Sequence, residues 1–199
     1  INTHLRNSSM NVAGILRGTT RPEEAIVISA HWDHFGIGEK ENGDSIYNGA
    51  VDNSTSMAWA LEIGEAFSSM KKRPQRSVIL FFPTAEEQGL IGSSWFVANP
   101  PVKQENLIAC FNNDLLLPIG RMKDVMVTGY GQSELDDLLA DAARKQDRYI
   151  LPDPNPESGM YFRSDHFPFA RAGVPALFAR GNYDSREYGR EWAAAQEKD

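Results

Sequence analysis

Three apolar runs of this sequence are each followed by histidine or carboxylate side chains. The runs span residues 25–30, 77–82 and 107–111, and the polar residues after them are His31-Trp32-Asp33-His34, Glu86-Glu87 and Asn112-Asn113-Asp114. Asp52 lies in a polar loop, and His166 precedes a fourth apolar run. Histidine and carboxylate side chains are common ligands of metal ions. We therefore expect side chains from these three segments, together with Asp52 and His166, to form a metal site.

The types of these ligands narrow the choice of metal. Imidazole and carboxylate without thiolate suit zinc, with cobalt or manganese as substitutes, whereas calcium and magnesium prefer all-oxygen sites. The three carboxylates of Asp52, Glu87 and Asp114 would be balanced by two divalent ions and one bridging hydroxide. A single ion would leave this shell negative, so the sequence favours two zinc ions.

The surrounding sequence alternates strands with helices. We predict strands at residues 12–17, 25–30, 77–82, 107–112, 124–128 and 174–178, and helices at 54–70, 90–98 and 132–145. The first two strands are expected to form an antiparallel hairpin, and residues 151–158 a proline-rich loop. Buried strands interleaved with helices imply an α/β fold, a three-layer sandwich with a mixed, mostly parallel central sheet flanked by helices. In such sheets, ligands bind beyond the carboxyl ends of the strands, where these candidate ligands occur.

Composition excludes several classes of partner. The chain has 27 acidic and 20 basic residues, and its formal net charge of −7 argues against nucleic acid and anionic membranes as partners. No membrane insertion is expected, because the longest purely apolar run, 78–82, is far shorter than the ~20 residues of a membrane span. The single cysteine, Cys110, excludes an internal disulfide and a thiolate zinc cluster, and it is predicted to be buried.

The length favours one domain. We expect residues 1–199 to form a single domain. The chain begins at Ile1 without an initiator methionine, so we interpret it as a fragment or a processed part of a longer chain.

Five short segments together resemble the M28 family of zinc aminopeptidases. In chain order they are Ser29-Ala30-His31-Trp32-Asp33-His34, Asn48-Gly49-Ala50-Val51-Asp52-Asn53, Ala85-Glu86-Glu87-Gln88-Gly89-Leu90-Ile91-Gly92-Ser93, Asn113-Asp114 and Arg163-Ser164-Asp165-His166. The resemblance covers residues 11–180 and implies a pair of zinc ions. His31 and Asp114 would hold one ion, Glu87 and His166 the other, and Asp52 would bridge them.

The same resemblance assigns further roles. Glu86 would be the general base, and Asp33 a carboxylate that orients His31. The peptide bond between Asp52 and Asn53 is expected to be cis, and His34 is left as an outer residue of the site.

The implied activity is that of an aminopeptidase acting on peptides with a free N-terminus. Two ions sharing a water lower its pKa from 15.7 toward about 7, and Glu86 would take its proton and deliver it to the departing amine. Met160, Tyr161 and Phe162 either form the wall of a pocket for the substrate side chain or pack beneath their own loop. Tyr161 and Tyr183 are candidate donors to the oxyanion.

Two other functions remain open. One is a single-zinc acyltransferase resembling glutaminyl cyclases, and the other is a non-catalytic, receptor-type domain of the same fold. The complete set of five ligands, His31 included, favours hydrolysis at two ions over both. Similarity to mostly exported enzymes implies a secreted or periplasmic location. The preferred N-terminal residue and the oligomeric state are not indicated by the sequence.

Overall fold

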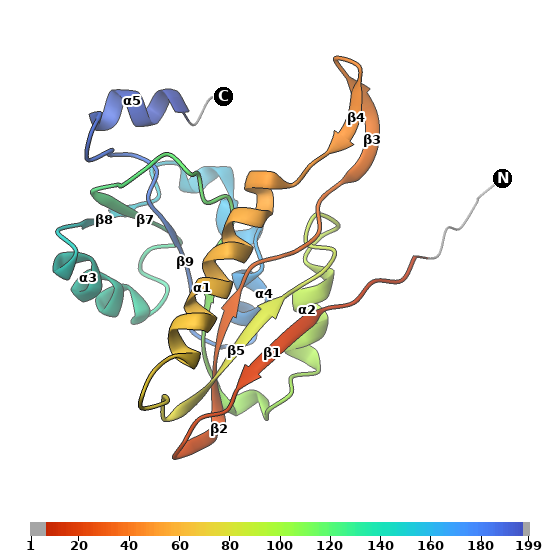
Figure 1. Cartoon of the computed structure of the whole chain (residues 1–199), viewed down its shortest axis with the longest axis vertical. Coiled ribbons are helices and arrows are strands. Elements are labelled where there is room, and N and C mark those ends of the chain that lie inside the picture. The colour runs from red at the N-terminus through yellow and green to blue at the C-terminus, as the bar shows by residue number, and fades with distance from the viewer. Residues whose placement is uncertain (1–6, 197–199) are drawn as a thin grey trace.

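A seven-stranded sheet forms the centre of the molecule (Figure 1). The computed structural model describes residues 7–196. The strands lie in the order β1-β5-β2-β6-β9-β7-β8. Their bounds are β1 Val12–Leu16, β2 Arg21–Ser29, β5 Arg76–Phe82, β6 Leu107–Asn112, β7 Asp124–Thr128, β8 Tyr149–Pro152 and β9 Ala176–Arg180. The central strands β5, β2, β6 and β9 are parallel, whereas β1 is antiparallel to β5 and β7 is antiparallel to β9. The predicted mixed, mostly parallel sheet is confirmed.

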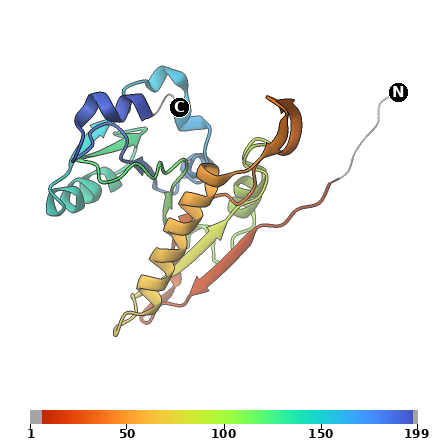
Figure 2. The same cartoon turned by 45° about the horizontal axis from the view of Figure 1, so that its top comes forward.

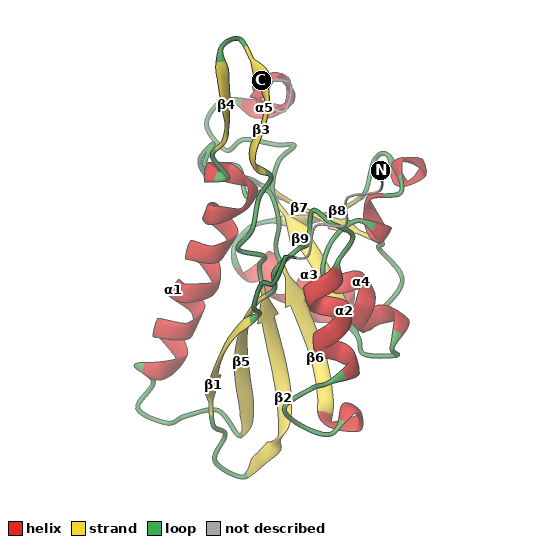
Figure 3. Cartoon of the chain, turned by 90° about the vertical axis from the view of Figure 1, so that its right-hand side faces the viewer, coloured by secondary structure: helices red, strands yellow, loops and turns green. Residues whose placement is uncertain are grey.

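Helices cover both faces of this sheet. Figure 3 shows α1 (Ser56–Ser68) on one side and α2 (Ile91–Ala98) and α4 (His166–Arg171) on the other. The alternation of side chains along β2 explains this arrangement. Val27 packs in the cluster that contains Phe96 of α2, whereas Ile28 packs in the cluster that contains Ala60 of α1. The predicted three-layer sandwich is therefore confirmed.

Two more α-helices are present among the described residues. The third helix of the chain, α3 (Leu135–Lys145), shares the face of α1, because Phe111 of β6 packs against the clusters of both. The last helix is α5 (Gly189–Gln196). None of the described helices is both long enough and apolar enough to cross a membrane.

The expected hairpin between the first two strands is wrong, because β5 lies between β1 and β2. The connection from β1 to β2 crosses the start of β5, where the backbone N–H of Thr19 donates to the Pro74 carbonyl at 3.0 Å. Gly18 approaches so closely there that a Cβ would lie 2.3 Å from the carbonyl oxygen of Gln75. A buried strand such as β5 can pair with a neighbour on either edge. The local sequence therefore does not indicate that β5 lies between β1 and β2.

A small antiparallel hairpin was not predicted. Its strands, β3 (Gly36–Glu41) and β4 (Asp44–Tyr47), form a separate two-stranded sheet. The hairpin projects from the body beyond the N-terminal end of α1 (Figures 1 and 2). The predicted loop at 151–158 is wrong for its first two residues, because β8 extends through Leu151 and Pro152 and pairs in parallel with β7.

The core beneath α2 and α4 is built on three phenylalanines. The rings of Phe81 and Phe96 stack with centroids 4.1 Å apart, and Phe169 meets both rings at 6.3 and 5.9 Å. Cys110 is fully buried in the same cluster, as predicted, and burial raises the pKa of its thiol. This layer supports the loops that follow β5 and β6.

Shortening the central ring of this cluster should lower stability. Phe81 has no exposed surface, so Phe81→Ala should reduce the free energy of unfolding by about 3–5 kcal/mol through lost burial and the cavity left behind. The measurement is urea unfolding followed by far-ultraviolet circular dichroism. Leu61→Ala is the control, since Leu61 is 54% exposed and should change this energy by no more than about 0.5 kcal/mol. Equal losses in both variants would contradict the assignment of the core.

Candidate metal centre

The candidate ligands come from the carboxyl ends of three neighbouring strands. His31 follows β2, Glu86 and Glu87 follow β5, and Asp114 follows β6. Because β5, β2 and β6 are adjacent and parallel, these ends meet at one edge of the sheet. Asp52 reaches the same edge from the turn that precedes α1, and the Asp52–Asn53 peptide bond is cis, as predicted.

One group of ligand atoms surrounds His31. Its Nε2 lies 3.1 Å from Asp52 Oδ1 and 3.3 Å from Asp114 Oδ1. Ligands about 2.0–2.1 Å from a tetrahedral zinc ion are separated by about 3.3 Å. The Asp52 Oδ1 atom is buried and has no partner with hydrogen-bond geometry among the described residues. One imidazole nitrogen and two carboxylate oxygens at these spacings fit a zinc ion.

The other ring nitrogen of His31 fixes the orientation of this group. Nδ1 lies 3.0 Å from the backbone carbonyl oxygen of Asp33. The carboxylate of Asp33 is farther away, at 3.9 Å, and instead accepts a hydrogen bond from the backbone N–H of Glu86 at 3.2 Å. Asp33 therefore contacts His31 through its backbone, while its side chain holds the residue predicted to be the base.

A second group contains Glu87, Asp52 and His34. The ligand atoms within each of the two groups lie no more than 4.8 Å apart, and Asp52 belongs to both. His34 Nδ1 is 2.6 Å from Glu87 Oε1. The sequence analysis placed His34 outside the set of ligands. The position of His34 directly after a strand, close to His31 and Asp33 in sequence, is the feature that could have indicated its place in this group.

His166 is described by the structure but belongs to neither group. It is fully buried at the start of α4, and its ring lies 5.0 Å from that of Tyr161 and 5.2 Å from that of Phe178. Neither ring nitrogen has a partner with full hydrogen-bond geometry among the described residues, although a contact with the backbone of Tyr161 favours the protonated form. Burial lowers the pKa of His166 to about 4, so its imidazole is neutral. Its role as a metal ligand stays a prediction.

Glu86 is almost fully buried beside these groups. Burial raises its pKa to about 9; the charge of His31 opposes this shift, and the charges of Asp165 and Asp114 add to it. A bound cation would favour the ionised form. The side chain is therefore placed to hold a proton near the candidate ligands.

Three polar residues that the sequence analysis gave no role hold Asp114 in place. The hydroxyl of Ser164 donates to Asp114 Oδ2 at 2.8 Å and accepts from the amide of Asn112 at 2.8 Å. Arg180 donates to the backbone carbonyl of Asp114 at 3.1 Å. The available signal was that Asn112 directly precedes the Asn113-Asp114 motif and that Ser164 lies inside the Arg163-Ser164-Asp165-His166 motif, but polar residues at such positions are equally typical of ordinary loops.

Asp165 is a further buried carboxyl group at this edge. It has no exposed surface, accepts a short hydrogen bond from the Ser93 hydroxyl, and burial raises its pKa to about 7.

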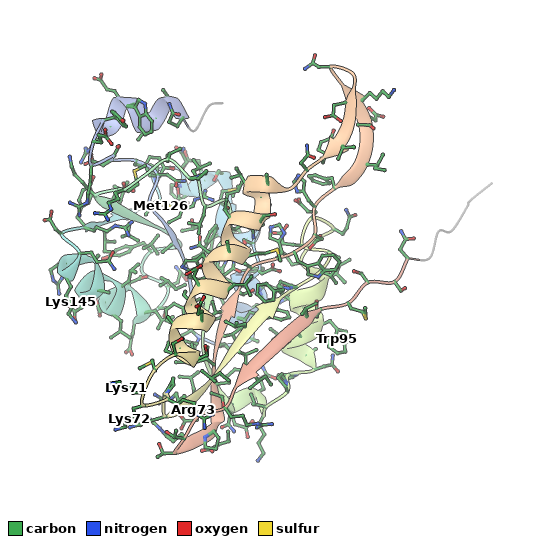
Figure 4. The ribbon with its side chains drawn as sticks, in the orientation of Figure 1. Lys71, Lys72, Arg73, Trp95, Met126 and Lys145 are labelled. Carbon is green, nitrogen blue, oxygen red and sulfur yellow. The ribbon has the colours of Figure 1, made fainter. Side chains whose placement is uncertain are left out.

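The basic residues Lys71, Lys72 and Arg73 lie beyond the far end of α1 (Figure 4). They are too distant to balance the carboxylates gathered at the candidate site.

Of the residues predicted to contact substrate, Tyr161 lies beside His166, with ring centroids 5.0 Å apart. Tyr161 and Phe162 line a cavity of about 440 Å³ together with Gly129, Tyr130 and Pro152. None of the candidate ligands lines this cavity. Met160 belongs to the same short helical turn, and Tyr183 lies after β9, where its backbone N–H donates to Asp124. The two interpretations of the 160–162 segment, pocket wall or loop packing, both remain predictions.

Comparison with known proteins places these features in a family. The model of peptidase family M28 matches residues 11–196. Aminopeptidase NAALADL1 of Rattus norvegicus is 37% identical over 116 residues, which are 56% of this chain and 14% of the rat protein. The chain thus spans well under a quarter of the length of that relative.

Solved structures of low identity share the fold. BSAP, a zinc aminopeptidase from Bacillus subtilis, aligns with a TM-score of 0.62 and 21% identity over 90% of this chain and 41% of its own. The Porphyromonas gingivalis glutaminyl cyclase aligns with a TM-score of 0.64 and 18% identity over 92% of this chain and 67% of its own. The fold alone therefore does not select between the reactions named for these two proteins.

Metal binding at His31 should depend on pH. Burial alone would lower its pKa, but contacts with Asp114 and Asp52 outweigh burial and raise this pKa to about 11. Below that value an ion must displace a proton, so zinc affinity should fall about tenfold for each unit of decreasing pH. Calorimetry in buffers of different ionisation enthalpy would count the released protons.

His31→Gln is the matched variant, because glutamine has no proton to release at this position. It should bind zinc more weakly and release about one proton fewer than the wild type. Wild-type affinity that stays constant between pH 6.5 and 7.5 would contradict a protonated His31.

Proposed function

Since this chain belongs to peptidase family M28, we propose that it is the catalytic part of a zinc-dependent aminopeptidase that hydrolyses N-terminal peptide bonds at a two-zinc centre. The observation that carries this proposal is the group formed by His31, Asp52 and Asp114, whose spacing fits zinc. The aminopeptidase named among the relatives supports the choice of substrate.

The position of Asp52 supports two ions rather than one, because its carboxylate lies within 4.8 Å of ligand atoms of His31 and Asp114 and also of Glu87. His31 and Asp114 would hold the first ion, Glu87 would hold the second, and Asp52 would contribute to both. His166 is proposed as the imidazole of the second ion. The bound ions would lower the pKa of a shared water and polarise the carbonyl group of the substrate.

Glu86 performs the proton transfers in this proposal. Its buried carboxyl group adjoins Glu87 in sequence, and the Asp33 carboxylate accepts the hydrogen bond of its backbone N–H. In the ionised form it takes a proton from the attacking water and returns that proton to the departing amine. Asp33 keeps the base in place by holding its backbone.

The proposal is tested by counting metal ions and comparing substrates. Protein stripped with a chelator and reloaded with zinc should bind two ions and hydrolyse aminoacyl anilides with a free α-amine. The same substrates blocked by an N-acetyl group should be hydrolysed at least about 100-fold more slowly, because differential binding of the reacting N-terminus supports catalysis. If N-acetylated peptides were hydrolysed at internal bonds as fast as the unblocked substrates are hydrolysed, the chain would be an endopeptidase.

Two outcomes would favour the other functions. One bound ion, together with cyclisation of an N-terminal glutamine, would indicate a glutaminyl cyclase. Protein that binds no zinc and hydrolyses no substrate of the panel would indicate a non-catalytic domain.

The role of Glu86 is tested by Glu86→Gln. Glutamine preserves the size of the side chain but cannot accept the proton, so kcat should fall by about 100-fold or more. Zinc content should remain at the wild-type value, because Glu86 is not proposed as a ligand. Glu87→Gln is the matched control and should lose the second ion. Near-normal kcat in Glu86→Gln, or loss of its zinc, would contradict the assignment of base and ligand.

A further inference from the structure

His34 makes a direct contact with one of the proposed metal ligands. Its Nδ1 lies 2.6 Å from Glu87 Oε1, and the two side chains are 20% and 12% exposed. Two ligands of one tetrahedral zinc ion would be about 3.3 Å apart, whereas a hydrogen bond to a carboxylate is about 2.7–2.9 Å. The contact therefore has the length of a short hydrogen bond, which the Nδ1–H of His34 donates.

The imidazole of His34 is held at the base of the β3–β4 hairpin. Its ring lies 5.1 Å from the ring of Phe35 and 6.4 Å from that of Tyr47, and these two rings meet edge to face at 5.8 Å. The pairing of Gly36 with Tyr47 closes the hairpin beside them. Phe35 directly precedes β3 and Tyr47 is the last residue of β4, so the two rings that lie near His34 are at the base of the hairpin.

The return of the chain from the hairpin also confines His34. Gly49 follows β4 and has a φ of +68°, and a Cβ at this position would lie 3.1 Å from the His34 Cβ. The backbone continues from Gly49 to Asp52, the carboxylate that both ligand groups share. One short segment therefore connects the hairpin, His34 and the bridging carboxylate.

We propose that His34 is a positioning residue that orients Glu87 for the second ion, and that the base of the β3–β4 hairpin fixes His34 in this role. The inference rests on the proposed function, because it requires Glu87 as a ligand. Hydrogen-bond partners of metal ligands orient the ligand, and their loss commonly weakens metal binding about 10–100-fold.

The test compares His34→Ala with His34→Asn by zinc titration of the metal-free chain. Alanine removes the donor, so the second zinc should bind about 10–100-fold more weakly, with the first zinc unchanged. Asparagine places an N–H near the position of Nδ1 and should restore most of the lost affinity. Visible absorption of bound Co²⁺ should be the same in wild type and His34→Ala at saturation, because His34 is not a ligand.

The contribution of the hairpin is tested with a matched pair of apolar residues. Phe35→Ala removes a ring that contacts His34 and should weaken the second zinc, whereas Ile37→Ala changes a side chain that is 82% exposed and should have no effect. The thermal unfolding temperature of each metal-free variant controls for a general loss of structure. Equal zinc affinities in these two variants would overturn the role of the hairpin.

The remaining outcomes separate this inference from the proposed function. A wild-type chain that binds two ions, with His34→Ala binding both equally tightly, would overturn only the role of His34. A changed Co²⁺ spectrum in His34→Ala without rescue by asparagine would overturn it by making His34 a ligand itself. A wild-type chain that binds fewer than two ions would overturn the two-ion function and this inference together.

Discussion

Repulsion among carboxyl groups is the constraint on which the candidate site depends. Asp52, Glu86, Glu87, Asp114 and Asp165 influence one another or His31 at one edge of the sheet. The positive side chains that act on Asp114 are those of His31 and Arg180. Burial is the largest cause of the raised pKa values of Glu86 and Asp165, and the charges of neighbouring carboxylates raise both values further. Divalent cations would reduce this repulsion without additional basic side chains.

The parallel register of the sheet creates this crowding. Pairing of β2 with β5 and with β6 brings three strand ends to the same level, so His31, Glu86 and Asp114 converge although long segments separate them in sequence. The aromatic core below α2 and α4 supports these strand ends. Asp52 is brought in from outside the sheet, by the turn between the β3–β4 hairpin and α1.

The local sequence predicted most of the strands and helices, but it did not predict which strands pair with one another in every case. The apolar runs of β2, β5 and β6 are buried strands because both faces are covered, and that pattern is visible in the residues alone. The position of β1 beside β5 was missed, because pairing across 60 or more residues leaves no mark on either strand. The β3–β4 hairpin was missed because its exposed strands have no continuous apolar run.

The sequence by itself determined the chemistry of the site, since residue types decide which ions and protons can be held. Only the tertiary structure decided which atoms meet. It grouped His31 with Asp52 and Asp114, and it placed His34 against Glu87 while His166 lies among aromatic rings. It also placed the Asp33 carboxylate 3.2 Å from the backbone N–H of Glu86 and 3.9 Å from His31 Nδ1. The physical reason is that distances of a few ångströms between side chains depend on long-range strand pairing and loop paths, which residue types and spacing do not specify.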